Sequence, residues 1–542
     1  AQDFVNNIQC KINAQEGNTL PVSAFTEYVD GTTPSGTAAY EKRGIAVNVP
    51  VWQPENCIQC NRCAYVCPHA AIRPVALTEE EAANAPEGIA TLPMTGMKDY
   101  KFTMTVSAYD CTGCGSCANV CPGKKGAKAL AMENMEANAG LQKFFDYGRE
   151  LPIKEDVIAK FKETTVKGSQ FKQPLLEFSG ACAGCGETPY AKLITQLFGD
   201  RMYIANATGC SSIWGNSSPS TPYTTNAKGQ GPAWANSLFE DNAEFGYGML
   251  LAQRAIRDGL KAKVEAVVAE GKDEAVKEAG QEWLDTFSVG ATNGAATDKL
   301  IAALEACGCD AAKEILTQKD YLSKKSQWIF GGDGWAYDIG FGGVDHVLAS
   351  GRDINVMVFD TEVYSNTGGQ SSKSTPTGAI AQFAAGGKET KKKDMASIAM
   401  SYGYVYVAQI SMGADFNQAI KAIAEAEAYP GPSLIIAYAP CINHGIKKGM
   451  SKAQTEEELA VKCGYWHNFR FNPAAEGSKF SLDSKAPDMT DYQEFLNGEV
   501  RYNSLQRQNP EKAARLFAKN QSEAKARYEY LQKLITLYGT EE

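Results

Sequence analysis

Residues 57–68 read CIQCNRCAYVCP and residues 111–122 read CTGCGSCANVCP, so the pattern C-x2-C-x2-C-x3-C-P occurs twice. This spacing is typical of a polypeptide that holds two [4Fe–4S] clusters. Three thiolates on one tight loop can hold three irons of a cubane, while the fourth, on the following helical turn, reaches the neighbouring cluster. The two runs therefore predict a two-cluster module in the first part of the chain.

The predicted ligand sets cross over between the runs. Cluster one takes Cys57, Cys60, Cys63 and Cys121, and cluster two takes Cys111, Cys114, Cys117 and Cys67. Structural zinc and a disulfide framework are the alternatives, but two identical runs that both end in Cys-Pro disfavour them. Two such clusters serve electron transfer, because each passes one electron and neither has an open coordination position for substrate.

Composition limits the class of protein. The chain has 542 residues, of which 44% are hydrophobic and 21% charged, and its net charge is −10. This length predicts two to four domains, and the acidic balance argues against nucleic acid as a partner. No apolar run approaches the roughly 18 residues of a membrane span, and no signal peptide is recognisable, so we expect a cytoplasmic protein away from membranes. The missing initiating Met fits processing, a fragment or one piece of a larger polypeptide.

A change of pattern divides the chain into two predicted domains. The first, residues 1–167, contains the cysteine runs, a Gly/Thr/Pro-rich leader (31–52) that we expect to drape over the cluster module, and a long insert (73–109). A polar stretch, residues 162–174, reads as the linker, with the boundary near Gly168. The module is expected to be a ferredoxin-like α+β domain.

The second domain, residues 168–542, alternates short apolar runs with helical patterns. The runs at 327–335, 354–360, 404–410 and 433–441 predict strands, and 336–350 and 414–429 predict the helices between them. This alternation is typical of an α/β fold with a mostly parallel sheet covered by helices. We also expect a helical insert at about 244–325 and a C-terminal helical arm at 509–539.

A phosphate and magnesium site is predicted where a strand turns into a helix at Gly332, Asp333 and Gly334. Glycines let the backbone approach a diphosphate, and the carboxylate offers a hard oxygen to Mg²⁺. After 26 further residues comes Thr361, in a spacing that resembles the thiamine diphosphate motif, where Asn is usual. The Thr361 hydroxyl and the Val363 carbonyl are further oxygen ligands.

Several longer motifs together resemble the C-terminal part of the pyruvate:ferredoxin oxidoreductase (2-oxoacid:ferredoxin oxidoreductase) family. Besides the cysteine runs they are GTAAYEKRGIAVNVPVW (36–52), ACAGCGETPY (181–190), ATGCSSIWGNSSPSTPY (207–223), GGDGWAYDIGFGG (331–343), DTEVYSNTGGQSSKSTPTGA (360–379) and VRYNSL (500–505). The resemblance implies a ferredoxin-like domain followed by a thiamine-binding α/β domain.

The resemblance also implies a third [4Fe–4S] cluster beside the thiamine, held by Cys182, Cys185, Cys210 and Cys441. Cys210 follows a strand predicted at 202–207, and Cys441 lies at the end of the run at 433–441. Ligands of parallel sheets bind at such strand ends. Cys10 and Cys463 match no ligand position and are expected to be buried thiols, and Cys307 and Cys309 are expected to be non-ligand thiols. The implied thiamine-binding residues are Glu187, Cys210, Gly332, Asp333, Gly334, Trp335, Thr361, Glu362, Val363, Tyr364, Ser365 and Asn366, with Asn366 and Glu187 as the catalytic candidates.

The activity that the resemblance implies is oxidative decarboxylation of pyruvate to acetyl-CoA. Implied partners are pyruvate or another 2-oxo acid, coenzyme A, and ferredoxin or flavodoxin, with a homo-oligomer expected. The family's activating glutamate and substrate-gripping arginine have no counterpart here, so an N-terminal portion or partner subunit is expected to supply them. A pure electron-transfer module, or the same chemistry on another 2-oxo acid, are the alternatives.

Overall fold

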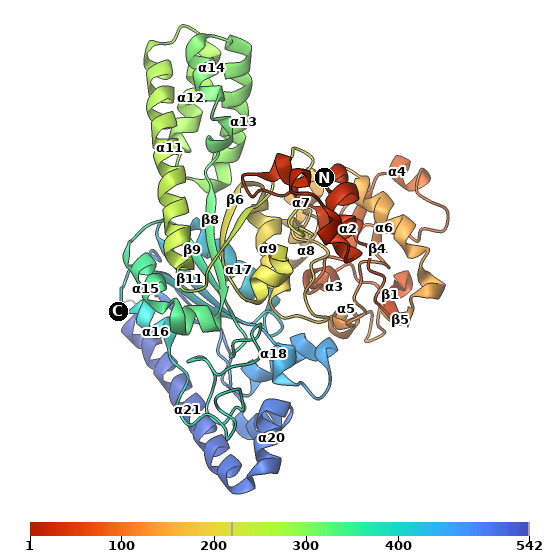
Figure 1. The fold of residues 1–542 in the computed structure, drawn as a ribbon, viewed down its shortest axis with the longest axis vertical. Coiled ribbons are helices and arrows are strands. Elements are labelled where there is room, and N and C mark those ends of the chain that lie inside the picture. The colour runs from red at the N-terminus through yellow and green to blue at the C-terminus, as the bar shows by residue number, and fades with distance from the viewer. Residues whose placement is uncertain (218–219, 540–542) are drawn as a thin grey trace.

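The structure is a computed structural model that describes residues 1–217 and 220–539, with the side chain of residue 217 left out of the description. A cysteine-rich module lies beside a larger α/β domain, and a helical tower projects from the α/β domain (Figure 1). Residues 218–219, within the motif at 207–223, and residues 540–542, within the second predicted domain, lie outside the described part.

An eight-stranded sheet forms the centre of the α/β domain, in the order β13-β12-β10-β11-β9-β8-β6-β7. The pairs from β10 to β7 are all parallel, whereas β12 and β13 add antiparallel pairs at one edge. The strands are β6 (Met202–Ala207), β7 (Ala233–Ser237), β8 (Ser326–Gly332), β9 (Ile354–Asp360), β10 (Tyr406–Ile410), β11 (Pro432–Tyr438), β12 (Phe469–Phe471) and β13 (Phe480–Leu482).

Both faces of this sheet are buried, because its central strands β9 and β11 are buried at every position and mostly apolar. In β9, Val356 and Val358 pack into one core with helices α11, α15 and α16, while Met357 and Phe359 pack into the other with α9 and α17. The predicted mostly parallel sheet covered by helices is confirmed. These helices are α9 (Thr188–Phe198), α15 (Phe341–Ala349), α16 (Met395–Met400) and α17 (Phe416–Ala428).

The tower is the predicted helical insert. It consists of α11 (Asn242–Glu270), α12 (Glu274–Asp285), α13 (Gly290–Cys307) and α14 (Asp310–Leu316). These helices have a core of their own around Trp283 and Leu300 (Figure 1). The predicted C-terminal arm is α21 (Pro510–Leu537), which follows α18 (Ala453–Lys462), α19 (Tyr492–Asn497) and α20 (Val500–Gln508). Among the described residues, we find no helix with the length and apolar character to cross a membrane.

Two small antiparallel sheets build the cysteine-rich module. β1 (Asn48–Trp52) pairs with β5 (Leu130–Asn134), and β4 (Lys101–Val106) pairs with both β2 (Ile72–Leu77) and β3 (Leu92–Pro93). The helices are α3 (Arg62–Tyr65), α4 (Glu79–Ala83), α5 (Ser116–Val120), α6 (Leu141–Glu150) and α7 (Glu155–Phe161). The insert at 73–109 therefore supplies most of the second sheet.

The leader bridges both parts of the molecule instead of covering the cluster module alone. Its last residues form β1, inside the module. Upstream, the Gly36 N–H donates to the Tyr223 carbonyl over 2.7 Å, and the Thr221 N–H donates to the Thr37 hydroxyl over 2.7 Å. Backbone groups of an extended segment need partners, and the α/β domain supplies them here.

The polar stretch at 162–174 is not the exposed linker that its composition predicted. Residues 168–171 are buried, and Gly168 lies inside α8 (Val166–Ser169). Just beyond, buried Glu177 is paired with Arg73 and, over 2.7 Å, with Arg149. Glu177 belongs to the second predicted domain and both arginines to the first, so these ion pairs cross the expected boundary. The division at 167/168 stays a prediction.

Candidate functional site

Each cysteine run forms a loop that leads into one short helix. α3 starts after Asn61, whose φ is +60°, and α5 starts after Gly115, whose φ is +79°. This left-handed conformation turns the loop sharply and is tolerated best by glycine and asparagine. The fourth cysteine of each run follows its helix, one turn away from the other three.

Two separate cavities lie between the loops, and each is lined by four cysteines. One cavity has Cys57, Cys60, Cys63 and Cys121, and the other has Cys67, Cys111, Cys114 and Cys117. The other walls are mainly apolar and include Trp52, Met104, Leu130, Pro50 and Ile72. The structure thus brings together the two crossed sets that the spacing predicts.

Three of these thiols are hard to ionise in the protein alone. Burial raises the pKa of Cys63 and of Cys117 well above the ordinary thiol value, and raises the pKa of Cys111 to about 12. Iron binds the thiolate, and a bound cluster supplies the positive charge that these cavities lack. Eight thiols, three of them buried and five half-buried, around two mainly apolar cavities fit a pair of [4Fe–4S] groups.

Four further cysteines converge from three distant segments. Cys182 and Cys185 lie in the loop before α9, Cys210 follows β6, and Cys441 follows β11. The Gly186 N–H donates to the Pro440 carbonyl over 3.1 Å, which joins the first segment to the third. A Cβ on Gly186 would meet the Pro440 nitrogen at 2.6 Å, so this close approach requires glycine.

The charges of this third group act on one another. Burial raises the pKa of Cys441 to about 12, and negative charge on Glu187 and Cys182 raises it further. Burial, Glu187 and Cys441 likewise raise the pKa of Cys185 and Cys210. The four cysteines therefore lie close enough to sense one another's charge, as ligands of one cluster must.

The side chain of Glu187 lies among these cysteines. It is 4% exposed and accepts a hydrogen bond of 2.7 Å from the Trp214 indole N–H. Burial raises the pKa of Glu187 to about 7. This carboxyl is therefore poised to gain or lose a proton near neutral pH, next to the third cysteine group.

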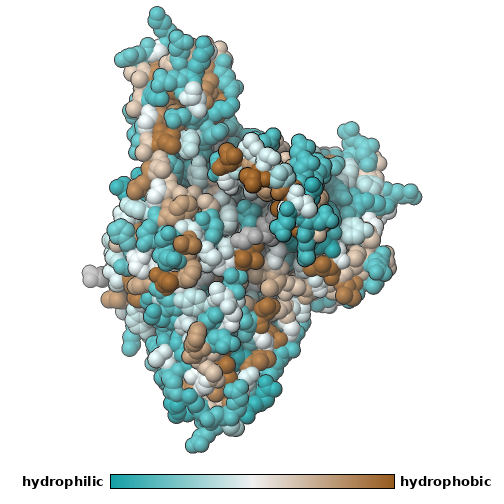
Figure 2. All heavy atoms as spheres, in the orientation of Figure 1, coloured by the Kyte–Doolittle hydropathy of each residue, from teal (hydrophilic) through white to brown (hydrophobic). Residues whose placement is uncertain are grey.

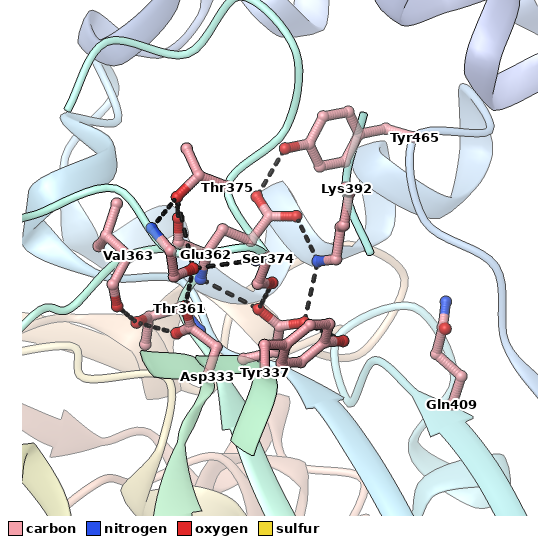
Figure 3. A network of polar contacts seen from close by, with 12 residues as sticks. Asp333, Tyr337, Thr361, Glu362, Val363, Ser374, Thr375, Lys392, Gln409 and Tyr465 are labelled. Atoms are coloured by element: carbon pink, nitrogen blue, oxygen red, sulfur yellow. Dashed lines mark hydrogen bonds and ion pairs between the residues drawn. The ribbon is translucent and has the colours of Figure 1, made fainter. Parts of the chain in front are cut away.

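The predicted magnesium ligands meet where β8 and β9 end (Figure 3). The Asp333 side chain is completely buried, and its Oδ1 lies 3.0 Å from the Thr361 hydroxyl oxygen. That hydroxyl also lies 3.0 Å from the Val363 carbonyl oxygen. Parallel strands β8 and β9 are neighbours, so their carboxyl ends bring residues 28 positions apart into contact.

This oxygen group fits a cation. The Thr361 hydroxyl has one proton but faces two acceptors, Asp333 Oδ1 and the Val363 carbonyl, at equal distance. One of these two oxygen–oxygen contacts therefore has no proton between its atoms, although Asp333 Oδ1 also accepts from the Thr361 N–H over 3.1 Å. A Mg²⁺ ion takes several oxygen ligands and removes this conflict.

The neighbouring glycines and aromatic residues form a tight wall. A Cβ on Gly334 would meet the Tyr364 ring at 2.4 Å, and a Cβ on Gly331 would meet the Trp335 ring at 2.4 Å. The Trp335 indole N–H is buried without a hydrogen-bond partner among the described residues. The predicted residues Gly332 to Trp335 and Tyr364 thus surround the oxygen group with backbone and rings.

A buried ion-pair network lies behind the oxygen group, and the sequence did not predict it (Figure 3). The Lys392 ammonium lies 2.9 Å from both Asp360 Oδ2 and Glu362 Oε1. Glu362 Oε2 also pairs with Arg501 over 2.8 Å and accepts from the Tyr465 hydroxyl over 2.6 Å. Despite its burial, these cations lower the pKa of Glu362 to about 2.

Glu362 was expected to bind thiamine, but its side chain is fully used by this network. Its φ of +62° is in the left-handed region, which is uncommon for a non-glycine residue. The network holds the backbone on both sides of Thr361. A signal was present in the triple lysine of KKKD (391–394), but sequence spacing does not reveal which lysine pairs with the buried carboxylates.

Ser365 connects the oxygen group to the third cysteine group. Its hydroxyl lies 3.1 Å from Cys210 Sγ, and its carbonyl accepts from the Asn443 amide over 3.2 Å. The same amide approaches Cys441 Sγ at 3.7 Å. Asn366, the predicted substrate-facing residue, is exposed beside this junction.

Within residues 1–217 and 220–539, no three or more His, Cys, Asp or Glu side chains form a group arranged to hold a single metal ion. The oxygen group described above contributes one such side chain, Asp333, together with a hydroxyl and a carbonyl.

Three protein-family models match the chain. A 4Fe-4S dicluster domain matches residues 56–125, and a thiamine pyrophosphate enzyme, C-terminal TPP binding domain, matches residues 290–437. A model named EKR, described as a domain of unknown function, matches residues 1–46. The first match contains the eight paired cysteines, and the second contains the Asp333 oxygen group. A two-cluster iron–sulfur domain and a thiamine pyrophosphate-binding domain are thereby confirmed.

Relatives named as pyruvate oxidoreductases match nearly the whole chain. Pyruvate-flavodoxin oxidoreductase from Klebsiella pneumoniae is 56% identical over 537 residues, and pyruvate:ferredoxin oxidoreductase from Moorella thermoacetica is 56% identical over 545 residues. The resemblance to the pyruvate:ferredoxin oxidoreductases is confirmed. The match covers 98% of this chain but only 45% and 46% of those two relatives. This chain therefore spans less than half the length of the pyruvate:ferredoxin oxidoreductases that it matches.

Proposed function

We propose that this chain carries the thiamine pyrophosphate–Mg²⁺ site and three [4Fe–4S] clusters of an enzyme that oxidatively decarboxylates pyruvate. Coenzyme A would take the acyl group, and ferredoxin or flavodoxin would take the electrons. The relatives' names support pyruvate over another 2-oxo acid. A cofactor-binding half with electron carriers is the role that the geometry supports best.

One observation carries the proposal. Ser365 lies at the same time next to Cys210 and, through Asn443, next to Cys441, while its chain neighbours at 361–363 form the oxygen group. A cluster on the third cysteine group would thus lie beside the thiamine site, as one-electron removal from a bound substrate requires. An electron relay without chemistry would have no need for this juxtaposition.

Each group then has a defined part. Bound thiamine pyrophosphate supplies the electron sink for loss of CO₂ from a 2-oxo acid, and the clusters carry electrons one at a time. Asp333, Thr361 and the Val363 carbonyl would hold Mg²⁺, and Asn366 would approach the substrate. Glu187 would hold or release a proton at its carboxylate next to the third cluster.

The rest of the active site would come from elsewhere. By the family resemblance, the base that activates the thiamine and the arginine that binds the substrate carboxylate belong to an N-terminal portion or a partner subunit. A homodimer is part of the same proposal. Exposed Asn366 is in a position to meet such a surface.

Calorimetric titration with thiamine pyrophosphate and Mg²⁺ tests the site. The cluster-reconstituted chain should bind the cofactor with a dependence on Mg²⁺, and Asp333→Asn should lose at least tenfold in affinity because an amide replaces the charged ligand. Asp345→Asn, a charge removal on nearby α15, is the matched control and should bind as the wild type does.

The same preparation distinguishes the two candidate roles. Retention of thiamine pyrophosphate with visible cluster absorption supports the enzyme. Equal affinity in Asp333→Asn and the wild type would remove the assignment of the diphosphate site, whereas no binding of thiamine pyrophosphate to the wild type would leave an electron-transfer module.

A further inference from the structure

A buried lysine of the α/β domain reaches into the cluster module. Lys192, on α9, is 2% exposed, and its ammonium donates to the carbonyls of Ala64 and, over 3.0 Å, of Tyr65. These two carbonyls lie on α3, in the chain between Cys63 and Cys67. Cys63 lines one cysteine cavity and Cys67 lines the other. The ammonium therefore lies next to the segment that both cavities share.

No carboxylate neutralises this ammonium within the described part of the chain. The charged groups that act on it are Cys67, the Arg73 guanidinium and Cys63, and Arg73 is itself positive and paired with Glu177. A buried ammonium without a counter-charge is strongly unfavourable, and burial lowers the pKa of Lys192 to about 8. The anionic groups that can compensate it are the cluster thiolates.

We propose that Lys192 is the buried counter-charge of the two clusters and raises their reduction potentials. This inference rests on the cluster ligation proposed above. A reduced cluster carries one more negative charge than the oxidised one, so a fixed positive charge nearby stabilises the reduced form. Because the Lys192 side chain is buried, water and salt screen this interaction weakly. The effect should be larger on the cluster held by Cys67, whose interaction with Lys192 is the stronger.

The second cysteine run contains an internal comparison. In the repeated pattern Asn119 occupies the place of Tyr65, and the Asn119 carbonyl accepts from Lys128 over 2.8 Å. Lys128 also donates to the Cys121 carbonyl over 2.6 Å. Both runs thus have a lysine at the same helix end, but Lys128 is exposed. Solvent should screen its charge, so it provides a matched control.

Redox titration followed by paramagnetic resonance on the cluster-loaded chain tests the proposal. Lys192→Met removes the charge and the hydrogen bonds, whereas Lys192→Gln removes the charge and keeps amide donors. In both variants the ratio of reduced to oxidised cluster at a fixed ambient potential should fall about tenfold, which is about 59 mV for a one-electron couple. Lys128→Met should change this ratio less than half as much on a logarithmic scale, and iron content should stay at the wild-type value in all three.

The outcomes separate charge from structure. A lower reduction potential in Lys192→Met but not in Lys192→Gln would overturn the inference, because it would show an effect of packing or hydrogen bonding and not of charge. Potentials that match the wild type in both Lys192 variants, with normal cluster signals, would overturn it as well and leave the proposed function intact. Absence of [4Fe–4S] signals from the wild type would instead overturn the cluster assignment and this inference together.

Discussion

Lys392→Met should destabilise the α/β domain strongly, because Lys392 neutralises two buried carboxylates. Its ammonium lies 2.9 Å from Asp360 and 2.9 Å from Glu362, and those side chains are 0% and 1% exposed (Figure 3). It also lies 4.9 Å from the centre of the Trp466 ring. The substitution keeps most of the side-chain volume and removes the charge.

The magnitude follows from what remains after the substitution. Removal of one partner from a buried pair typically costs about 3–5 kcal/mol. Glu362 keeps Arg501 at 2.8 Å, so the charge left without a partner is mainly that of Asp360, and the lower value of about 3 kcal/mol applies. Each kcal/mol lowers the midpoint of a domain of this size class by about 2 °C or more, so we expect a drop of about 6 °C.

Thermal unfolding of the cluster-loaded chain, followed by near-UV circular dichroism, measures this drop. Lys391→Met, on the exposed neighbouring lysine, should shift the midpoint by less than about 1 °C, since surface substitutions usually change stability by no more than 0.5 kcal/mol. Lys392→Met with Asp360→Asn should recover at least half of the loss, because removing both charges of a buried pair is often nearly neutral. A midpoint for Lys392→Met within about 1 °C of the wild type, or no recovery in the double variant, would refute the reasoning.

Other features give three further predictions. Iron and sulfide assays should find about twelve irons for three cubanes, and about eight would remove the third cluster. Burial raises the pKa of Glu457 from 4.5 to about 8, so the free energy of unfolding should fall as pH rises through this range. In urea unfolding, the free energy of unfolding of Glu457→Gln should therefore equal that of the wild type near pH 5 and be larger by on the order of 4 kcal/mol at pH 8.5. A difference in this free energy that does not change with pH would contradict the prediction. The Cys307 thiol donates to Cys309 Sγ at 2.8 Å, so excess glutathione disulfide should convert the tryptic peptide 300–313 to an internal disulfide, two hydrogens lighter. Cys10, which was expected to be buried but is exposed, is alone on its peptide and should keep a glutathione adduct. A persistent adduct on 300–313 would argue against the pairing.

Figure 2 shows the face of Figure 1 with apolar residues scattered among polar ones and gathered in small groups along the groove between the cysteine-rich module and the α/β domain. The exposed apolar residues of the leader include Ile45 and Val47, at 61% and 76% exposure. These side chains belong to the segment that bridges the two parts. The sequence predicted that the leader drapes over the cluster module, and the structure shows that it also contacts the α/β domain.

The amino-acid sequence alone determined the features that depend on local spacing. The strand predicted at 354–360 is β9, and the strand at 202–207 is β6, because buried parallel strands are continuous apolar runs. The crossed cysteine sets followed from a repeat of twelve residues. Asp333 and Thr361 could be connected because they end neighbouring strands of one βαβ unit.

Only the tertiary structure decided which distant residues meet. Lys192 donates to carbonyls 127 and 128 positions earlier, and Cys441 joins a group whose first member, Cys182, lies in another segment. Lys392 and Lys391 are adjacent and chemically identical, yet half-buried Lys392 pairs with two buried carboxylates whereas Lys391 is exposed. Periodicity reports which face of an element is apolar, but the partner of a charged side chain depends on how whole elements pack, and packing is a property of the complete fold.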